Sequence, residues 1–169
     1  MLKFNSLRGI WRQNAVFFAA AALIIIADQL SKLWIRSNLA WGESTWDIGF
    51  FRLINVHNTG AAFGIFQDHS LLLTIIAITG ICFILFLVFF MYRRFYILNT
   101  ILCKLSLGLI LGGTIGNLID RLRSGYVTDF IDFNFWPAFN VADSAVTVGA
   151  ILLAYSLFRL ARRSESQDG

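Results

Sequence analysis

Residues 71–91 read LLLTIIAITGICFILFLVFFM and contain no charged side chain. A helix that crosses the hydrocarbon core of a bilayer needs about 20 consecutive, mostly apolar residues, so this stretch predicts a membrane-spanning helix. The whole chain has a matching composition: only 14% of its 169 residues are charged, whereas soluble domains average about 25%. We therefore expect an integral membrane protein.

Three further apolar segments predict spans at about 15–35, 98–118 and 143–160. The first begins with an unbroken apolar run, residues 15–27, behind three basic residues, a pattern that also fits a cleaved signal peptide. No small-x-small cleavage site follows, and the apolar helix continues to Trp34 and Ile35. We thus expect an α-helical membrane protein of four spans, a single domain over residues 1–169, with loops at about 36–70 and 119–142.

The lysines and arginines are divided unevenly between the two sides of this topology. Nine lie on the side of the termini and five on the other, and such an excess marks the cytoplasmic side. The nine are Lys3, Arg8, Arg12, Arg93, Arg94, Lys104, Arg159, Arg162 and Arg163, and the five are Lys32, Arg36, Arg52, Arg121 and Arg123. Both termini are therefore expected in the cytoplasm. Because the basic residues form no stripe interleaved with aromatics, we expect no nucleic-acid partner.

The first outer loop contains the strand-like run 50–56, followed by Asn58, Thr59 and Gly60. This pattern predicts a small extended or β platform at the outer interface. In the third span, Gly108, Gly112 and Gly116 recur every four residues and allow another helix to approach closely. The partner is expected to be a helix of the same chain, with dimerisation as the alternative.

Asp28 is an ionisable residue on a spanning helix, where a charge is costly. Lys32 lies one turn later on the same face, so the two can pair. They form either a structural ion pair or part of a site. Asn117, Asp120 and Arg121 share a helix face in the same way, and they either end the helix as a solvated ion pair or support a site in the following loop.

A third polar cluster comprises Asp129, Asp132, Asn140 and Asp143. Asp143 or Asn140 can cap the fourth helix, Asp129 and Asp132 can belong to a solvated acidic loop, and several carboxylates together can hold Ca²⁺ or Mg²⁺. A fourth possibility is catalysis, because two close carboxylates share a proton and act as acid and base at one pH.

Other catalytic classes lack their motifs. The chain has no nucleophile-elbow serine or cysteine, and His57 and His69 are not at H-E-x-x-H spacing and are expected at the surface. Cys82 and Cys103 fall in apolar runs, as small hydrophobic residues do. A transporter with a proton relay is the rival function, but it predicts ionisable groups throughout the membrane depth, whereas these cluster at one end.

Four segments together resemble the signal peptidase II family of bacterial membrane aspartic peptidases. The segments are 28–32 (DQLSK), 58–63 (NTGAAF), 112–121 (GGTIGNLIDR), and 127–130 (VTDF) with 139–144 (FNVADS). The resemblance implies that Asp129 and Asp143 form the catalytic dyad and that Asp132 does not take part. It implies that a further set shapes the site or holds substrate: Asn58, Gly60, Asn117, Asp120, Arg121 and Asn140, with Asp28 and Lys32 as a brace.

The same resemblance implies the substrate and the location. The substrate would be a prolipoprotein that carries a diacylglyceryl group on a cysteine and is cut on the amino side of that cysteine. Its lipid chain would reach the site laterally from the membrane lipid. The enzyme would act in the bacterial inner membrane as a monomer, with its active site at the extracytoplasmic face and without a metal or other cofactor.

Overall fold

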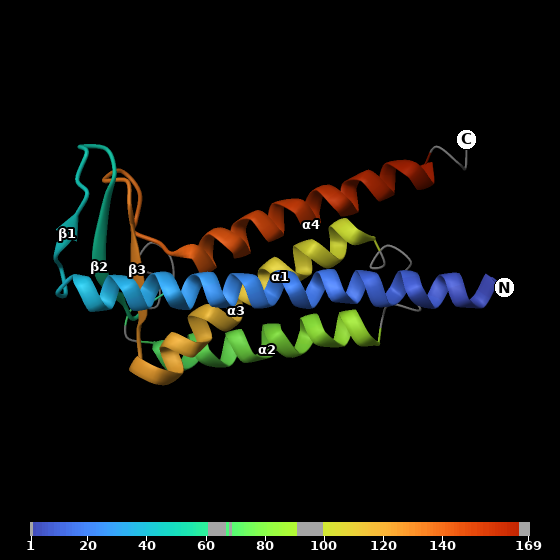
Figure 1. The fold of residues 1–169 in the computed structure, drawn as a ribbon, viewed down its shortest axis with the longest axis horizontal. Coiled ribbons are helices and arrows are strands. Elements are labelled where there is room, and N and C mark those ends of the chain that lie inside the picture. The colour runs from blue at the N-terminus through green and yellow to red at the C-terminus, as the bar shows by residue number, and fades with distance from the viewer. Residues whose placement is uncertain (1, 61–66, 68, 91–99, 166–169) are drawn as a thin grey trace.

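The computed structural model describes residues 2–60, 67, 69–90 and 100–165. In this part of the chain four helices run lengthwise and a small sheet lies across one end of them (Figure 1). The helices are α1 (Leu2–Asn38), α2 (Ser70–Phe89), α3 (Ile101–Ser124) and α4 (Val141–Glu165). Helix α1 begins and helix α4 ends at the end of the bundle away from the sheet.

Each helix contains a segment that is long and apolar enough to cross a membrane: Asn14–Asn38, Ser70–Phe89, Ile101–Ser124 and Val141–Arg159. The prediction of four spans is confirmed. Residues 91, 98 and 99 of the predicted bounds lie outside the described residues. Helix α3 continues beyond residue 118 because its stop signal comes later, at Gly125, whose φ of 79° is left-handed. Asp120 and Arg121 therefore lie on the helix.

The sheet has three antiparallel strands in the order β1 (Ser44–Thr45), β2 (Arg52–Asn58) and β3 (Val127–Asp132). The predicted platform is confirmed, although its residues 61–66 lie outside the described part. Strand β3 comes from the second loop, and most of its side chains, including Asp129 and Asp132, are buried. The alternative of a solvated acidic loop is therefore wrong, since pairing with β2 places this segment inside the fold.

Helix α3 packs against α1 and α4 through glycines. A Cβ atom at Gly108 would lie 2.5 Å from the carbonyl oxygen of Phe17, and one at Gly112 would lie 2.7 Å from that of Ala21. Gly113 faces the backbone of α4 in the same way. Only a residue without a side chain permits this approach, so the glycine stripe serves packing within the chain.

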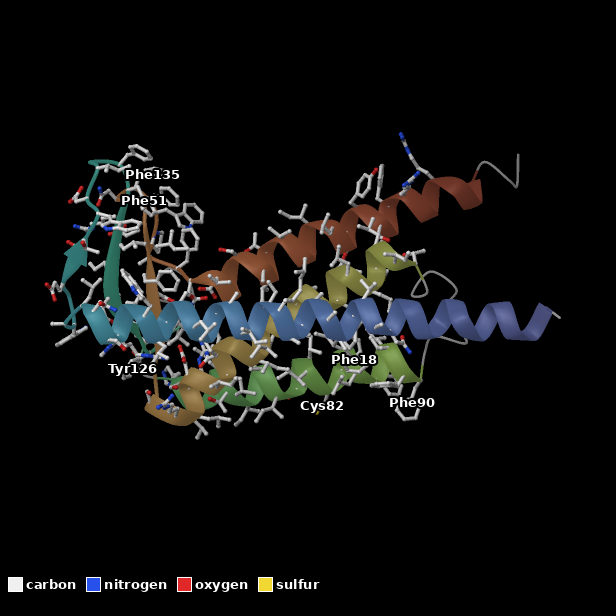
Figure 2. The ribbon with its side chains drawn as sticks, viewed as in Figure 1. Phe18, Phe51, Cys82, Phe90, Tyr126 and Phe135 are labelled. Atoms are coloured by element: carbon white, nitrogen blue, oxygen red, sulfur yellow. The ribbon has the colours of Figure 1, made fainter. Side chains whose placement is uncertain are left out.

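Two apolar clusters hold the described elements together. One joins α1, α2 and α3 in the helical half of the molecule, around Phe17 and Leu107, where Figure 2 also shows the side chains of Phe18 and Phe90. The other comprises Ile35, Leu39 and Phe130 and packs β3 against the C-terminal end of α1. In the first cluster the stabilisation comes from close van der Waals packing, because membrane lipid is as apolar as the side chains themselves.

Candidate active site

A cavity of about 890 Å³ lies where strands β2 and β3 meet helices α2, α3 and α4. Asp129 and Asp143 both line it, together with Asn58, Asn117 and Arg121. The cavity thus brings together two carboxylates that are 14 positions apart in the sequence, 129 to 143. Polar groups that converge in a largely apolar pocket are the usual form of a substrate site.

Asp129 lies on β3 and is only 2% exposed. Its Oδ1 accepts a hydrogen bond from Nδ2 of Asn140 (2.7 Å), and its Oδ2 accepts one from Nδ2 of Asn58 (2.8 Å). Burial, followed by the nearby charge of Asp143, raises the pKa of Asp129 to about 7. At neutral pH this carboxyl can therefore hold or release a proton.

Asp143 and Asn140 cap the start of helix α4 reciprocally. Asn140 precedes the helix and its Oδ1 accepts the backbone N–H of Asp143 at 2.9 Å, while Oδ2 of Asp143 accepts the backbone N–H of Asn140 at 3.3 Å. This exchange is the capping-box arrangement, here with an aspartate at the third helical position. The capping role expected for Asn140 or Asp143 is thus shared, and it orients the Asp143 carboxylate, whose Oδ1 accepts a bond from Asn117 (2.7 Å).

Asp28 and Lys32 form a buried ion pair of 2.9 Å, and both side chains have no exposed surface. Nζ of Lys32 also lies 3.0 Å from Asp120 and donates to Oδ1 of Asn117 at 2.8 Å. Asp28 accepts the backbone N–H of Ala142, an N–H that the first turn of α4 leaves without a partner. The pair therefore links α1 to α3 and α4, the helices that carry Asn117 and Asp143.

Arg121 does not pair with Asp120, so the solvated ion pair considered as one alternative is absent among the described residues. Its Nη2 donates to the carbonyl oxygen of Gly60 at 3.3 Å, and its buried Nε has no hydrogen-bond partner. The backbone N–H of Gly60 in turn donates to Oδ1 of Asn58. Arg121 thus lines the cavity with a guanidinium whose buried Nε is unpaired.

Asp132 lies away from this cavity and has other partners. Its Oδ2 pairs with Nε of Arg52 at 2.7 Å, and its Oδ1 accepts the backbone N–H of Asn134. His57 is half-buried, with its ring stacked on those of Trp41 (centroids 5.8 Å apart) and Tyr126 (3.7 Å), and His69 is exposed. Among the described residues, no three His, Cys, Asp or Glu side chains gather as metal ligands.

Gln29, Arg36 and Thr128 also belong to the polar network, although no motif reasoning selected them. Nε2 of Gln29 donates to the carbonyl oxygen of Gly116 at 3.1 Å, and Arg36 reaches Asp120 and Thr128. The sequence contained a signal for Arg36, because it follows Lys32 by four residues and so extends the same helix face. Thr128 has no such spacing signal, although it lies in the segment 127–130 that carries part of the family resemblance.

The sequence matches a known protein family and its curated members. A family model described as Signal peptidase (SPase) II matches residues 20–159. A Dehalococcoides mccartyi protein named lipoprotein signal peptidase is 50% identical over 85% of this chain and 90% of its own length. Proteins of the same name from Moorella thermoacetica and Burkholderia ambifaria are each 43% identical, over 83% and 89% of this chain and 91% and 92% of their own lengths.

Solved structures show the same fold. A bacterial membrane enzyme determined by the in meso method at 2.3 Å resolution superposes with a TM-score of 0.73 and 30% identity, over 85% of this chain and 87% of that one. A second, determined at 1.9 Å resolution, gives 0.72 and 31%, over 83% and 91%. With the family model spanning most of its length, the chain belongs to the signal peptidase II family and is a membrane protease.

Proposed function

We propose that the chain is an aspartic endopeptidase that removes signal peptides from diacylglyceryl-modified prolipoproteins, cutting on the amino side of the lipidated cysteine. The name shared by its relatives, lipoprotein signal peptidase, supports this substrate class. The observation that carries the chemistry is the shared cavity of Asp129 and Asp143. Each of their four carboxylate oxygens accepts one hydrogen bond from an N–H group of a neighbouring residue.

In the proposed mechanism one aspartate is ionised and the other is protonated. Asp129 holds the proton, in keeping with its pKa of about 7, and Asp143 accepts a proton from the water that attacks the scissile carbonyl. Asp129 donates its proton to the carbonyl oxygen as the tetrahedral intermediate forms. Collapse of that intermediate breaks the C–N bond: the departing amine takes up the proton that the water gave to Asp143, and one hydroxyl of the intermediate returns a proton to Asp129 as the product carboxyl group forms. Arg121 offers its donors to substrate carbonyl groups.

The cavity walls support a lipidated substrate. Leu73 and Ile76 of α2 and Val146 and Val148 of α4 line it beside the carboxylates, and both helices have the length and hydropathy to span a membrane. Acyl chains can lie against these residues while the peptide reaches the dyad. We further propose one membrane domain that acts as a monomer in the inner membrane, with cytoplasmic termini and an extracytoplasmic active site.

The test is an assay of the purified, detergent-solubilised protein with a lipidated precursor peptide and its unlipidated twin. Only the lipidated peptide should be cut, and Asp129→Asn or Asp143→Asn should abolish cleavage. Asp132→Asn, which alters a buried aspartate outside the cavity, should keep most of the activity. A chelator should not reduce the activity of the wild type. Full activity in either variant would refute the catalytic dyad. Equal cleavage of both peptides would refute the preference for a lipidated substrate.

A further inference from the structure

Thr128, the residue before Asp129, is held at each of its polar atoms. Its backbone N–H donates to Oδ2 of Asp120 (3.2 Å), its carbonyl oxygen accepts from Nδ2 of Asn140 (3.4 Å), and its Oγ1 accepts from Nη1 of Arg36 (3.1 Å). The residue has no exposed surface. Helices α1 and α3 and the residue that caps α4 therefore all hold one point of strand β3.

Arg36 makes two of these contacts at once. The Nη1 atom that donates to Thr128 also lies 3.2 Å from Oδ1 of Asp120. Oδ2 of Asp120 is occupied by the backbone N–H of Thr128 and by Lys32. Asp28, Lys32 and Arg36 are three charged residues on one face of α1, and Arg36 is the nearest of them to the C-terminal end of the helix. Of the three, only Arg36 contacts the side chain of Thr128, the residue next to Asp129.

Neither Arg36 nor Thr128 lines the cavity, whereas Val127 and Asp129 on either side of Thr128 do. Side chains alternate along a strand, so the side chain of Thr128 points to the opposite face of the sheet from that of Asp129. A shift of Thr128 would tilt the Asp129 carboxylate without changing any group that touches substrate. Misplacement of a reacting group by about 1 Å can cost on the order of a hundredfold in rate.

We propose that Arg36 and Thr128 are positioning residues for Asp129, acting through the hydrogen bond from the Arg36 guanidinium to the Thr128 hydroxyl. The inference rests on the proposed function, in which Asp129 belongs to the dyad. It assigns to Thr128 an effect on the rate of the chemical step and not on substrate binding. A contact that only stabilises the fold would change Tm without lowering kcat at constant KM.

Two substitutions at Thr128 separate the hydroxyl from the shape of the side chain. Thr128→Val keeps the shape and removes the acceptor, and it should lower kcat on the order of tenfold or more with KM unchanged, because the loss is one of orientation. Thr128→Ser keeps the hydroxyl and should retain most of kcat. Thr79→Val is the matched control, since Thr79 is exposed, its hydroxyl donates to the carbonyl oxygen of Ile75 within α2, and it does not line the cavity.

Arg36→Gln provides a second route that does not alter the sheet. It should lower kcat to a similar degree, with KM again unchanged. The double variant should lose little more kcat than Arg36→Gln alone, because Arg36→Gln already removes the hydrogen bond to Thr128 together with the contact to Asp120. Fully multiplicative losses in the double variant would overturn the proposal, as would a normal kcat in Thr128→Val or an equal loss in Thr128→Ser.

Asp129→Asn in the same assay distinguishes this inference from the proposed function. If Asp129→Asn is inactive while Thr128→Val and Arg36→Gln cleave at the wild-type rate, only the positioning role fails. If Asp129→Asn is active, the dyad itself fails. Thermal midpoints of all variants in detergent, measured beside the rates, show that a lowered kcat belongs to a folded protein.

Discussion

Replacing Asp129 with Asn should make the stability of the folded protein less sensitive to rising pH. Asp129 is 2% exposed, and its burial beside Asp143 raises its pKa from 3.8 to about 7 in the folded protein. A carboxyl whose pKa is higher in the folded state binds its proton more tightly there than in the unfolded chain. Its contribution to stability is fully present below pH 3.8 and is lost as the pH rises to about 7.

The pKa values set the size of this loss, because one unit corresponds to about 1.36 kcal/mol. About 1.6 kcal/mol is lost by pH 5 and about 4 kcal/mol above pH 8, so about 2.5 kcal/mol is lost between these two conditions. For a chain of this length the loss amounts to roughly 5–10 °C in Tm. An asparagine at position 129 has no proton to lose and should not show this component.

The assay is thermal unfolding in detergent at pH 5, 6, 7 and 8 for the wild type, Asp129→Asn and a control, Asp47→Asn. Asp47 is exposed in the loop between β1 and β2. The Tm of Asp129→Asn relative to the wild type should rise with pH, while that of Asp47→Asn should stay level. All other titrating groups are common to the compared proteins, so a pH-independent difference for Asp129→Asn would refute the buried, proton-bearing carboxyl.

Three further predictions concern the same end of the bundle. The cleavage rate should fall as the pH rises through about 7, because the dyad then loses its last proton; a constant rate up to pH 9 would contradict this. Gly116→Ala would place a Cβ 2.6 Å from Oδ2 of Asp28, and should destabilise the protein by about 1–3 kcal/mol, whereas Gly80→Ala, with open space around it, should not lower Tm. Lys32→Met should cost about 3–5 kcal/mol, because it leaves the buried Asp28 and Asp120 carboxylates without their shared cation; an unchanged Tm would show that these charges need no partner.

Much of the fold could be predicted because the bilayer imposes a simple length and hydropathy rule. Length and hydropathy were sufficient to predict the span around residues 71–91. The four-residue spacing of Asp28 and Lys32 predicted their contact within one helix. Pairing of Lys32 with Asp120 was not predictable, because it depends on how α1 and α3 are aligned side by side. Periodicity describes one helix and not the register between two.

The burial of strand β3 could not be predicted from its own sequence. Asp129 and Asp132 give their segment the polarity of a loop, and only pairing with β2 and contact with α1 make it a buried strand. The capping role of Asp143 was recognised in the sequence, but so was a catalytic one. The cap uses Oδ2 of Asp143 and the residue still lines the cavity, so capping does not conflict with the proposed catalytic role.

The interface between α1 and α3 explains why the charged network lies where it does. Gly108, Gly112 and Gly116 recur every four residues along α3, and the next position in that series is Asp120. The face that packs closely through glycines in the apolar half therefore becomes ionic at the sheet end, where Lys32 and Arg36 of α1 meet Asp120. Close packing sets the distance between the two helices, and at that distance the carboxylate of Asp120 reaches both α1 and strand β3. The same helix contact that stabilises the membrane bundle thus places the segment that carries Asp129.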